Sequence, residues 1–429
     1  MSSKTTPSAE EAATTLSVVP DGGVSTPAGF RAAGVHAGFR RNPSRLDYAL
    51  VVPDEPCAGA GVFTANRFCA APVQVCRENL GGMDRGYGTV AAVSVNSGNA
   101  NAATGAEGLA VARQTCEILA GELGCEPGQV LVASTGVIGQ PLAIDPFAAG
   151  IPAALAGLSA DGGTDAAKAI MTTDTRPKEH AVRYESSAPG YEGATFCVGG
   201  MCKGSGMIMP NMATMIAVVT TDAPVAPETL HDILSGSVRE TFNKVTVDSD
   251  TSTNDTCIML ASGAAAPGLP PIAEGGEAYD ELLGAVREVC ETLARDIASD
   301  GEGASKLVTV TVAGAASEDD ADVAARAVAN SPLVKTCIAG HDCNWGRVAA
   351  ALGKCGATFE QGNVDIDMMG IPVCRDGLTV AFDEQEALRR FEEPEIVIWA
   401  DLGAGGHSTT VWTCDLTHDY VSINGDYRS

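Results

Sequence analysis

Histidine, aromatic and basic residues are scarce in this chain of 429 residues. It has six histidines and 5% aromatic residues, and 27 lysines and arginines stand against 54 aspartates and glutamates, for a net charge of −27. A protein that binds nucleic acid through a basic surface is excluded, because no excess of positive charge offsets the acidic field. That field could attract a cationic substrate, although net charge by itself predicts solubility more than a specific function.

Patterns typical of metal sites are also missing. No Cys-x-x-Cys pair occurs among the 14 cysteines, and the closest pairs are Cys197 with Cys202 and Cys337 with Cys343. Neither pair resembles a zinc site, and the scattered histidines add no ligand cluster. We therefore expect no bound metal, and free thiols in a reducing cytoplasm.

Signals for membranes and secretion are absent as well. No run approaches the roughly 20 apolar residues that span a bilayer. The beginning of the chain, MSSKTTPSAEEAATTLSVV, lacks the basic start and apolar stretch of a signal peptide. Its Ser/Thr/Ala-rich composition predicts disorder over residues 1–24. We expect a soluble, cytoplasmic protein that binds no membrane.

Helix and strand patterns are both present, together with 49 glycines. Apolar residues at helical spacing predict helices at EGLAVARQTCEILAGEL, PETLHDILSGSVRETF and AYDELLGAVREVCETLARDIA. Strands are predicted at Thr89–Val95, at QVLVASTGVIG before a turn at Ser134–Gly136, and at LVTVTVAG. EIVIWADLGAGGHSTTVWTCDL indicates a hairpin around Gly403–Gly406. This mixture lacks strict βαβ alternation, so it favours a layered α/β (α+β) fold over a doubly wound sheet.

The stretch KGSGMIMPNMATMIAVVTTDA, residues 203–223, joins a glycine-rich turn to an apolar, strand-like run at Thr214. A threonine hydroxyl is a poor nucleophile unless a base takes its proton. As the first residue of a chain, threonine can use its own α-amine, whose ordinary pKa is about 7.7–8.0. Cleavage of the Ala213–Thr214 bond would create that amine. The residues alone leave two interpretations open: a core threonine that starts a strand, or a nucleophile.

The same stretch resembles the signature K-G-[SA]-G-M-I-x-P-x-[ML]-A-T-M-L of the ArgJ family, the glutamate N-acetyltransferases also called ornithine acetyltransferases. Further segments are similar to the family and follow its order from about Gly29 to Ser429. They are GFRAAGVHAGFR, GAGVFTANRFCAAPV, VNSGNANAATG, STGVIG, IMTTDT, DSDTSTNDT, DGEGASK, NWGR and INGDYRS.

The resemblance implies roles for particular residues. Thr214 matches the nucleophile that is freed by self-cleavage after Ala213, and Thr135 and Gly136 match the pair that holds the oxyanion. A hydroxyl and a backbone N–H beside a glycine suit that role. Further positions match substrate-binding residues, and their chemistry suits an amino acid, since Lys203 could hold a carboxylate and Glu302 an ornithine ammonium. These positions are Thr172, Lys203, Thr214, Glu302, Asn424 and Ser429.

The resemblance also implies a reaction and an assembly. Acetyl would pass from N2-acetyl-L-ornithine to Thr214 and then to L-glutamate, in arginine biosynthesis, with no cofactor; acetyl-CoA is a possible second acetyl donor. The fold would be a layered α/β sandwich of the ArgJ/DmpA-like type. Self-cleavage would give an α chain of residues 1–213 and a β chain of residues 214–429, intertwined with each other. Two such pairs would form a heterotetramer.

Two alternatives make different predictions. A self-cleaving aminopeptidase or amidase of related architecture would share the N-terminal nucleophile and lack the exchange between ornithine and glutamate. An acidic binding or scaffold protein would neither cleave itself nor depend on Thr214.

The chain departs from the family pattern at Cys343, where a proline is common, and at Met209, where a small residue is usual. We expect the loss of the proline to relax one turn and Met209 to slow processing slightly.

Overall fold

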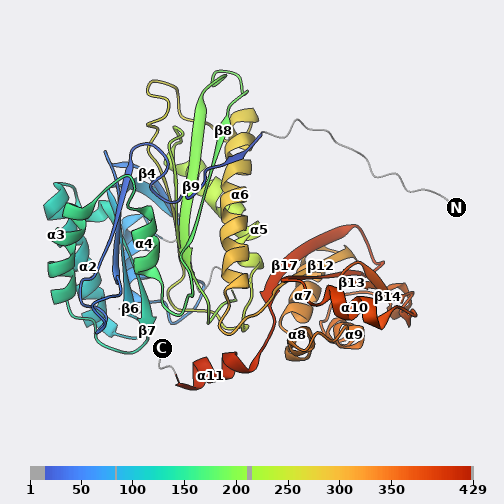
Figure 1. The fold of residues 1–429 in the computed structure, drawn as a ribbon. Helices are drawn as coiled ribbons and strands as arrows, with labels where there is room; N and C mark the ends of the chain where they lie inside the picture. Colours follow the sequence, from blue (N-terminus) through green and yellow to red (C-terminus); the bar gives the residue numbers. More distant parts are fainter. Residues whose placement is uncertain (1–14, 83–84, 210–214, 427–429) are drawn as a thin grey trace.

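The computed structural model describes residues 15–82, 85–209 and 215–426, which form three β-sheets with helices packed against them (Figure 1). The strands of the first half are β1 Ser17–Val18, β2 Phe30–Val35, β3 Tyr48–Pro53, β4 Cys57–Phe63, β5 Tyr87–Val90, β6 Ala92–Asn99, β7 Val130–Val137, β8 Lys178–Glu185 and β9 Thr195–Lys203. Those of the second half are β10 Ile216–Thr221, β11 Thr256–Ala261, β12 Leu307–Ala315, β13 Asp365–Met368, β14 Ile371–Arg375, β15 Leu378–Thr379, β16 Glu395–Asp401 and β17 His407–Cys414.

The helices cover the faces of these sheets. They are α1 Ala71–Asn79, α2 Gly105–Leu123, α3 Asp145–Gly157, α4 Gly163–Ile170, α5 Pro227–Glu240, α6 Glu277–Ser299, α7 Glu318–Ala329, α8 Pro332–Ala339, α9 Trp345–Gly353, α10 Glu384–Arg390 and α11 His418–Asp426. Short 3₁₀ turns lie at Pro127–Gln129, Phe242–Lys244 and Gln361–Asn363. Helix and sheet layers therefore alternate, which confirms the layered α/β class predicted from the sequence.

The larger body stacks two of the sheets (Figure 1). Helix α4 contacts β2, β3 and β6 of the four-stranded sheet on one side and β8 and β9 of the seven-stranded sheet on the other. Helices α2 and α3 pack against the four-stranded sheet, and α5 and α6 pack against the seven-stranded one. One apolar core lies on each side of the seven-stranded sheet, so its central strands are buried on both faces.

The seven-stranded sheet joins segments from both sides of the Ala213–Thr214 bond. Its order is β1-β8-β9-β10-β11-β4-β5, so β10 lies between β9, from before the bond, and β11, from after it. Every residue of β10 is buried, with Ile216 and Val218 in one core and Ala217 and Val219 in the other. The two segments predicted as α and β chains are therefore intertwined within one sheet.

The third sheet belongs to a smaller lobe, seen at the right of Figure 1, where α7 to α10 pack around it. Its order is β15-β14-β13-β16-β12-β17. The hairpin predicted around Gly403–Gly406 is wrong, because β12 lies between β16 and β17 and pairs with both. After β17 the chain leaves this lobe, and α11 passes under the larger body in Figure 1.

Two other local predictions need correction. The strand predicted over Thr89–Val95 is two strands, because the chain passes at Ala91 from β5 in the seven-stranded sheet to β6 in the four-stranded sheet. The turn predicted at Ser134–Gly136 is the end of β7, paired with β6. The three predicted helices are confirmed as α2, α5 and α6. In α6, Leu282, Val286, Val289, Leu293 and Ile297 form its buried stripe.

Order begins within the segment for which the sequence predicts disorder. Ser17–Val18 pairs with β8, and Val24 is fully buried, while residues 1–14 lie outside the described part of the chain.

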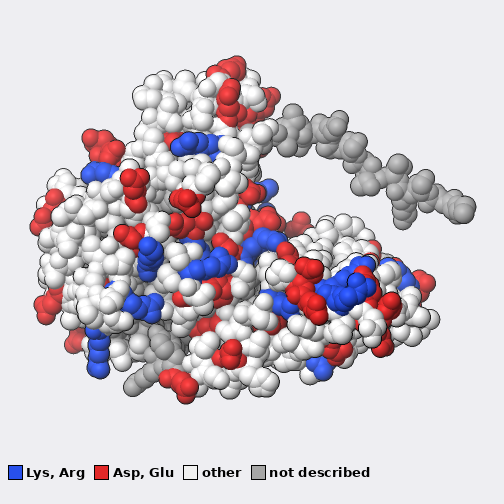
Figure 2. Space-filling model, viewed as in Figure 1, with Lys and Arg blue, Asp and Glu red and all other residues white. Residues whose placement is uncertain are grey.

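Figure 2 shows Asp and Glu side chains scattered over the whole visible face, with Lys and Arg among them. On this face the excess negative charge is therefore spread out and does not form one acidic surface.

Candidate active site

A pocket in the larger body brings together six of the residues predicted from the sequence. They are Thr135, Gly136, Thr172, Lys203, Glu302 and Asn424. Ala213, Thr214 and Ser429 lie outside the described residues. The described chain resumes at Met215, whose carbonyl accepts a hydrogen bond from Thr256 N at 3.0 Å, and β10 begins at the next residue.

Thr135 and Gly136 line the pocket from the end of β7. Gly136 has φ +132°, and a Cβ there would lie 2.4 Å from the carbonyl carbon of Gly98. Only glycine fits so close to the backbone of β6 in this conformation. The hydroxyl of Thr135 and the backbone of Gly136 thus border the cavity on rigid strands, and their oxyanion role remains a prediction.

Lys203 ends β9 opposite the start of β10, where it pairs with Ile216. Its side chain is buried, and Nζ donates to Thr135 Oγ1 at 3.3 Å. Burial lowers the pKa of Lys203, and the nearby carboxylates of Asp174 and Glu302 oppose that shift. An ammonium has three donors and only one of them meets Thr135, so Lys203 can also bind an anionic group in the pocket.

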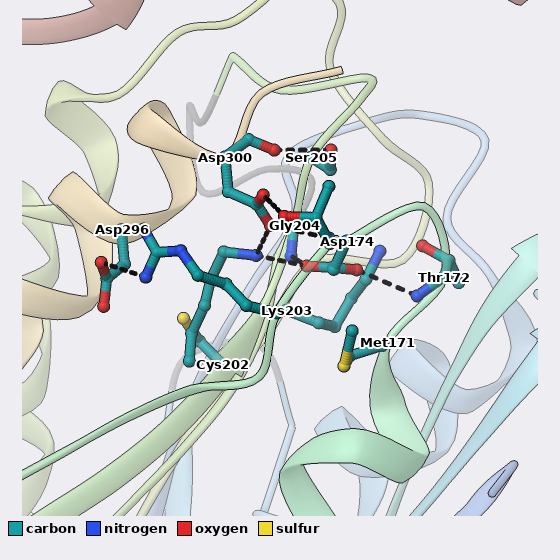
Figure 3. A network of polar contacts seen from close by, with 12 residues as sticks. Met171, Thr172, Asp174, Cys202, Lys203, Gly204, Ser205, Asp296 and Asp300 are labelled. Carbon is teal, nitrogen blue, oxygen red and sulfur yellow. Dashed lines mark hydrogen bonds and ion pairs between the residues drawn. The ribbon is translucent and has the colours of Figure 1, made fainter. Parts of the chain in front are cut away.

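Thr172 reaches the pocket on a turn that a buried carboxylate holds. Asp174 Oδ2 accepts from Thr172 N at 2.9 Å, and Oδ1 accepts from Gly204 N at 2.7 Å (Figure 3). Burial opposes ionisation of Asp174, but the ammonium groups of Lys203 and Lys178 outweigh it and keep its pKa below the usual value. One anion therefore links the Thr172 turn to the residue after Lys203.

Glu302 and Asn424 form the other side of the pocket. Asn424, on α11, donates from Nδ2 to Glu302 Oε2 at 2.7 Å, although the two residues are 122 positions apart. Gly206 packs directly beneath this carboxylate, because a Cβ on it would lie 2.3 Å from Glu302 Cδ. The last glycine of the KGSG segment therefore makes room for Glu302.

Several pocket residues had no role assigned from the sequence. The carboxylate of Asp248 accepts hydrogen bonds from Met207 N at 2.6 Å, from Ile208 N at 2.8 Å and from the hydroxyl of Tyr420 at 3.3 Å. Burial raises its pKa. The motif DSDTSTNDT, which contains Asp248, Asp250, Ser252 and Asn254, is the signal that could have pointed to most of the polar ones. The remaining lining residues are Ala100, Ile138, Thr173, Gly206, Met207, Asp248, Asp250, Ser252, Asn254 and Tyr420.

Acidic groups outnumber the single lysine at this site. Asp248, Asp250 and Glu302 line the pocket with Lys203. Asp255, also from DSDTSTNDT, is buried next to Thr256, and neither of its carboxylate oxygens has a hydrogen-bond partner among the residues that the structure describes. Burial raises the pKa of Asp255 well above its usual value. One cation beside the acidic side chains of the pocket suits a ligand that carries both a negative and a positive group.

The two departures from the family pattern lie outside the pocket lining. Cys343 is in the smaller lobe, with Sγ 3.9 Å from the sulfur of Met368. Met209 accepts a hydrogen bond from Thr251 Oγ1 through its carbonyl at 3.1 Å.

In the described part of the chain, no group of three or more His, Cys, Asp or Glu side chains is placed to hold a metal ion, and no helix could cross a bilayer. All 14 cysteines are free thiols.

A sequence profile described as the ArgJ family matches residues 31–429. The chain belongs to the ArgJ family. An arginine biosynthesis bifunctional protein ArgJ from Symbiobacterium thermophilum is 50% identical over 409 residues, which cover 95% of this chain and 99% of that protein. A protein of the same name from Thermosynechococcus vestitus is 44% identical over 424 residues, which cover 95% and 98%.

Solved structures of ArgJ proteins also match. A chain of the bifunctional ArgJ protein from Bacillus halodurans is 39% identical, covers 48% of this chain and 97% of its own, and has a TM-score of 0.47. A chain of ornithine acetyltransferase from Mycobacterium tuberculosis, solved in complex with ornithine, is 40% identical, covers 46% and 99%, and has a TM-score of 0.41. The sequence identities place both proteins in the same family as this chain.

Proposed function

We propose that this ArgJ protein transfers acetyl from N2-acetyl-L-ornithine to L-glutamate and so recycles acetyl groups in arginine biosynthesis. The observation that carries the proposal is the convergence of Thr135, Gly136, Lys203, Glu302 and Asn424 on one pocket beside the start of β10. These residues come from separate family motifs. The names of the relatives, which are arginine biosynthesis proteins and an ornithine acetyltransferase, agree with this reaction.

The reaction proceeds in two halves through one covalent intermediate. The Thr214 hydroxyl attacks the acetyl carbonyl of N2-acetylornithine while its α-amine takes the hydroxyl proton. The proton passes to the leaving nitrogen, ornithine departs, and an acetyl-threonine ester remains. The amine of glutamate then attacks this ester, gives up a proton through the same α-amine, and leaves as N-acetylglutamate with Thr214 restored.

Thr135 and Gly136 stabilise the oxyanion in both halves. Because Lys203 Nζ donates to Thr135 Oγ1, the lone pair used there is occupied and the hydroxyl hydrogen is free to donate elsewhere. A hydroxyl donor and a backbone N–H fixed on a strand need no rearrangement when charge develops on the carbonyl oxygen. Lys203 holds the carboxylate of the amino-acid substrate.

The acidic side of the pocket recognises the ornithine side chain. Glu302 is buried, and Asn424 Nδ2 orients one of its oxygens. A carboxylate held in this way forms a strong, charge-assisted hydrogen bond with an ammonium group. Glutamate has no side-chain ammonium, so Glu302 serves mainly the half-reaction that involves ornithine.

Self-cleavage between Ala213 and Thr214 precedes catalysis, and the two fragments remain associated, two of each in a heterotetramer. Support comes from the position of β10 between β9 and β11, because separation of the fragments would break the centre of a buried sheet. A denaturing gel of the purified protein should show two bands, and the second fragment should begin Thr-Met-Ile. A single full-length band that Thr214→Ala does not change would overturn the mechanism.

Acetyl-CoA is proposed as a second acetyl donor for glutamate, since curated relatives are named bifunctional. No organic cofactor or metal is proposed for either reaction, and the fourteen free thiols suit a cytoplasmic enzyme. Labelled acetyl-CoA and glutamate, incubated with the cleaved enzyme, should yield labelled N-acetylglutamate. If labelled acetyl-CoA gives no labelled N-acetylglutamate while N2-acetylornithine with a labelled acetyl group does, the enzyme is restricted to the exchange reaction.

A further inference from the structure

A charged cluster lies behind the pocket wall. The side chain of Lys178, at the start of β8, is fully buried, and Nζ donates to Asp174 Oδ1 at 2.7 Å and to Asp300 Oδ2 at 2.5 Å. Burial opposes the charge on Lys178, but the two carboxylates outweigh it and raise the pKa of the ammonium. One cation therefore joins two anions that come from different parts of the chain.

Each of the two carboxylates also holds a segment that lines the pocket. Asp174 accepts from the backbone of Thr172 and of Gly204, which follows Lys203. Asp300 accepts from Thr175 N at 3.1 Å and from the hydroxyl of the same residue. The segments that carry Thr172 and Lys203 are thus tied to the end of α6.

The end of α6 is connected in turn to Glu302. Ser205 Oγ donates to the carbonyl of Asp300 at 2.7 Å (Figure 3). The carbonyl of Ser205 accepts a hydrogen bond from Glu302 N at 2.9 Å. Figure 3 shows Asp300, Ser205, Gly204 and Asp174 stacked on one side of Lys203. The spacing between Lys203 and Glu302 therefore depends on a chain of contacts that includes the buried charges.

We propose that Asp174, Lys178 and Asp300, called here the charged clamp, are positioning residues that set the distance between Lys203 and Glu302 and thereby the length of diamino acid that the enzyme accepts. None of the three lines the pocket, so the clamp acts through the residues that it holds. The inference rests on the proposed function, in which Lys203 binds the substrate carboxylate and Glu302 the side-chain ammonium.

Chain length is a property that such spacing can select. N2-acetyllysine differs from N2-acetylornithine by one methylene group, which moves the ammonium relative to the carboxylate. A rigid pair of charged contacts discriminates against this shift, whereas a loosened pair accommodates it. Loss of the clamp should therefore change substrate preference as well as rate.

The test replaces the whole clamp, because removal of one partner would leave a buried charge unpaired and could prevent folding. In Asp174→Asn/Lys178→Met/Asp300→Asn, the asparagine at 300 keeps an oxygen for Thr175 N, and the asparagine at 174 keeps one for either Thr172 N or Gly204 N, which two different oxygens of Asp174 serve. Activity is normalised to the cleaved fraction of each sample. We expect KM for N2-acetylornithine to rise about tenfold or more while kcat falls less. The ratio of kcat/KM for N2-acetylornithine over N2-acetyllysine should fall roughly fivefold or more.

A matched control is available at the other end of α6. Glu281 is buried and accepts from Ser186 Oγ, Ser187 N and Ser187 Oγ at 2.5–2.9 Å, but it lies 19 positions before Asp300, about 28 Å along the helix. Glu281→Gln removes a comparable buried charge and should leave both KM and the substrate ratio unchanged.

The outcomes separate the two proposals. A triple variant that folds and keeps the wild-type KM and substrate ratio would overturn the clamp, as would equal changes in Glu281→Gln. If the triple variant does not fold, Lys178→Arg decides, because it keeps the charge and alters the geometry; an unchanged ratio there would also overturn the proposal. A wild-type enzyme that transfers no acetyl from N2-acetylornithine would overturn the proposed function, and the clamp's role in selectivity with it.

Discussion

The two sides of the pocket are built in different ways. Thr135, Gly136 and Lys203 stand on β7 and β9, inside sheets whose ladder bonds and buried faces hold the backbone. Glu302 follows the end of α6, and Asn424 lies on α11, a short helix without buried residues. The chemical side is therefore part of the core of the larger body, whereas the recognition side is held by a few hydrogen bonds between distant segments, such as Asn424 to Glu302 and Tyr420 to Asp248.

The difference suggests a division of labour. Groups that stabilise a transition state must be fixed before the reaction, and strands fix them well. Groups that recognise a substrate side chain can sit on segments that dock from elsewhere. Changes at Thr135 and Gly136 should thus lower kcat for both half-reactions, and changes on the Glu302 side should raise KM for ornithine compounds.

Thr214→Ala should have the largest effect. The variant lacks the nucleophilic hydroxyl. Because the chain then stays uncleaved, no free α-amine forms at residue 214 either, so turnover should fall by about 10⁴-fold or more. Steady-state acetyl transfer and a denaturing gel measure the two losses. If the uncleaved variant still exchanged acetyl at a comparable rate, Thr214 would not be the nucleophile, and the division of the pocket into a chemical and a recognition side would be wrong.

Gly136→Ala should be next. The added Cβ would lie 2.4 Å from the carbonyl carbon of Gly98, and the positive φ disfavours alanine, so the end of β7 must shift. Displacement of one oxyanion donor costs about 10²–10³-fold in kcat. Both half-reactions should slow equally when measured by single-turnover acetylation and deacylation. Gly139→Ala, nearby but with nothing within 4 Å of its Cβ, is the control for general strain from a positive φ.

Glu302→Gln should have a selective effect. The variant loses the proposed charge-assisted contact with the ornithine ammonium, which corresponds to about 1.5–3 kcal/mol, or roughly 10–150-fold in kcat/KM. The kcat/KM for acetylation of the enzyme by N2-acetylornithine should fall by this factor, and the rate of deacylation by glutamate should change little. Equal losses in both half-reactions would contradict the assignment of Glu302 to the ornithine side chain.

Asn424→Ala should act in the same direction with a smaller effect. It removes the donor that orients Glu302 Oε2 but leaves the carboxylate charge, so KM for N2-acetylornithine should rise by about tenfold or less. The double variant with Glu302→Gln should be no worse than Glu302→Gln alone, because Asn424 acts through Glu302. Additive losses would show that Asn424 contacts the substrate independently.

The smallest effect concerns pH, and it should reach both sides together because Asp174 supports Thr172 and the residue after Lys203. The pKa of Asp174 is held below its ordinary value of 3.8, so its stabilising contribution is complete above that pH and is lost as the pH falls through the lower, folded value. The stability difference between wild type and Asp174→Asn, from urea midpoints, should therefore shrink below about pH 4. A difference that stays constant with pH would contradict this.

Much of the site could be predicted because the motifs carry it. STGVIG, TTDT, KGSG and DGEGASK each contain a residue that lines the pocket, and the resemblance to the ArgJ family was sufficient to select them. Asp248 and Tyr420 were missed, because a loop aspartate and a helical tyrosine look ordinary until their hydrogen bond is seen. Ala213, Thr214 and Ser429 stay predictions of the sequence alone.

The sequence by itself determined the family, the helices with a clear apolar stripe such as α6, and the threonine to which the reaction is assigned, since these depend on local pattern and motif. Tertiary structure decided that β12 separates β16 from β17, that α11 brings Asn424 to Glu302, and that Lys178 joins Asp174 to Asp300. Periodicity reports which face of one element is buried. Which faces then meet, across more than a hundred residues, depends on the packing of whole layers, and no local pattern contains that information.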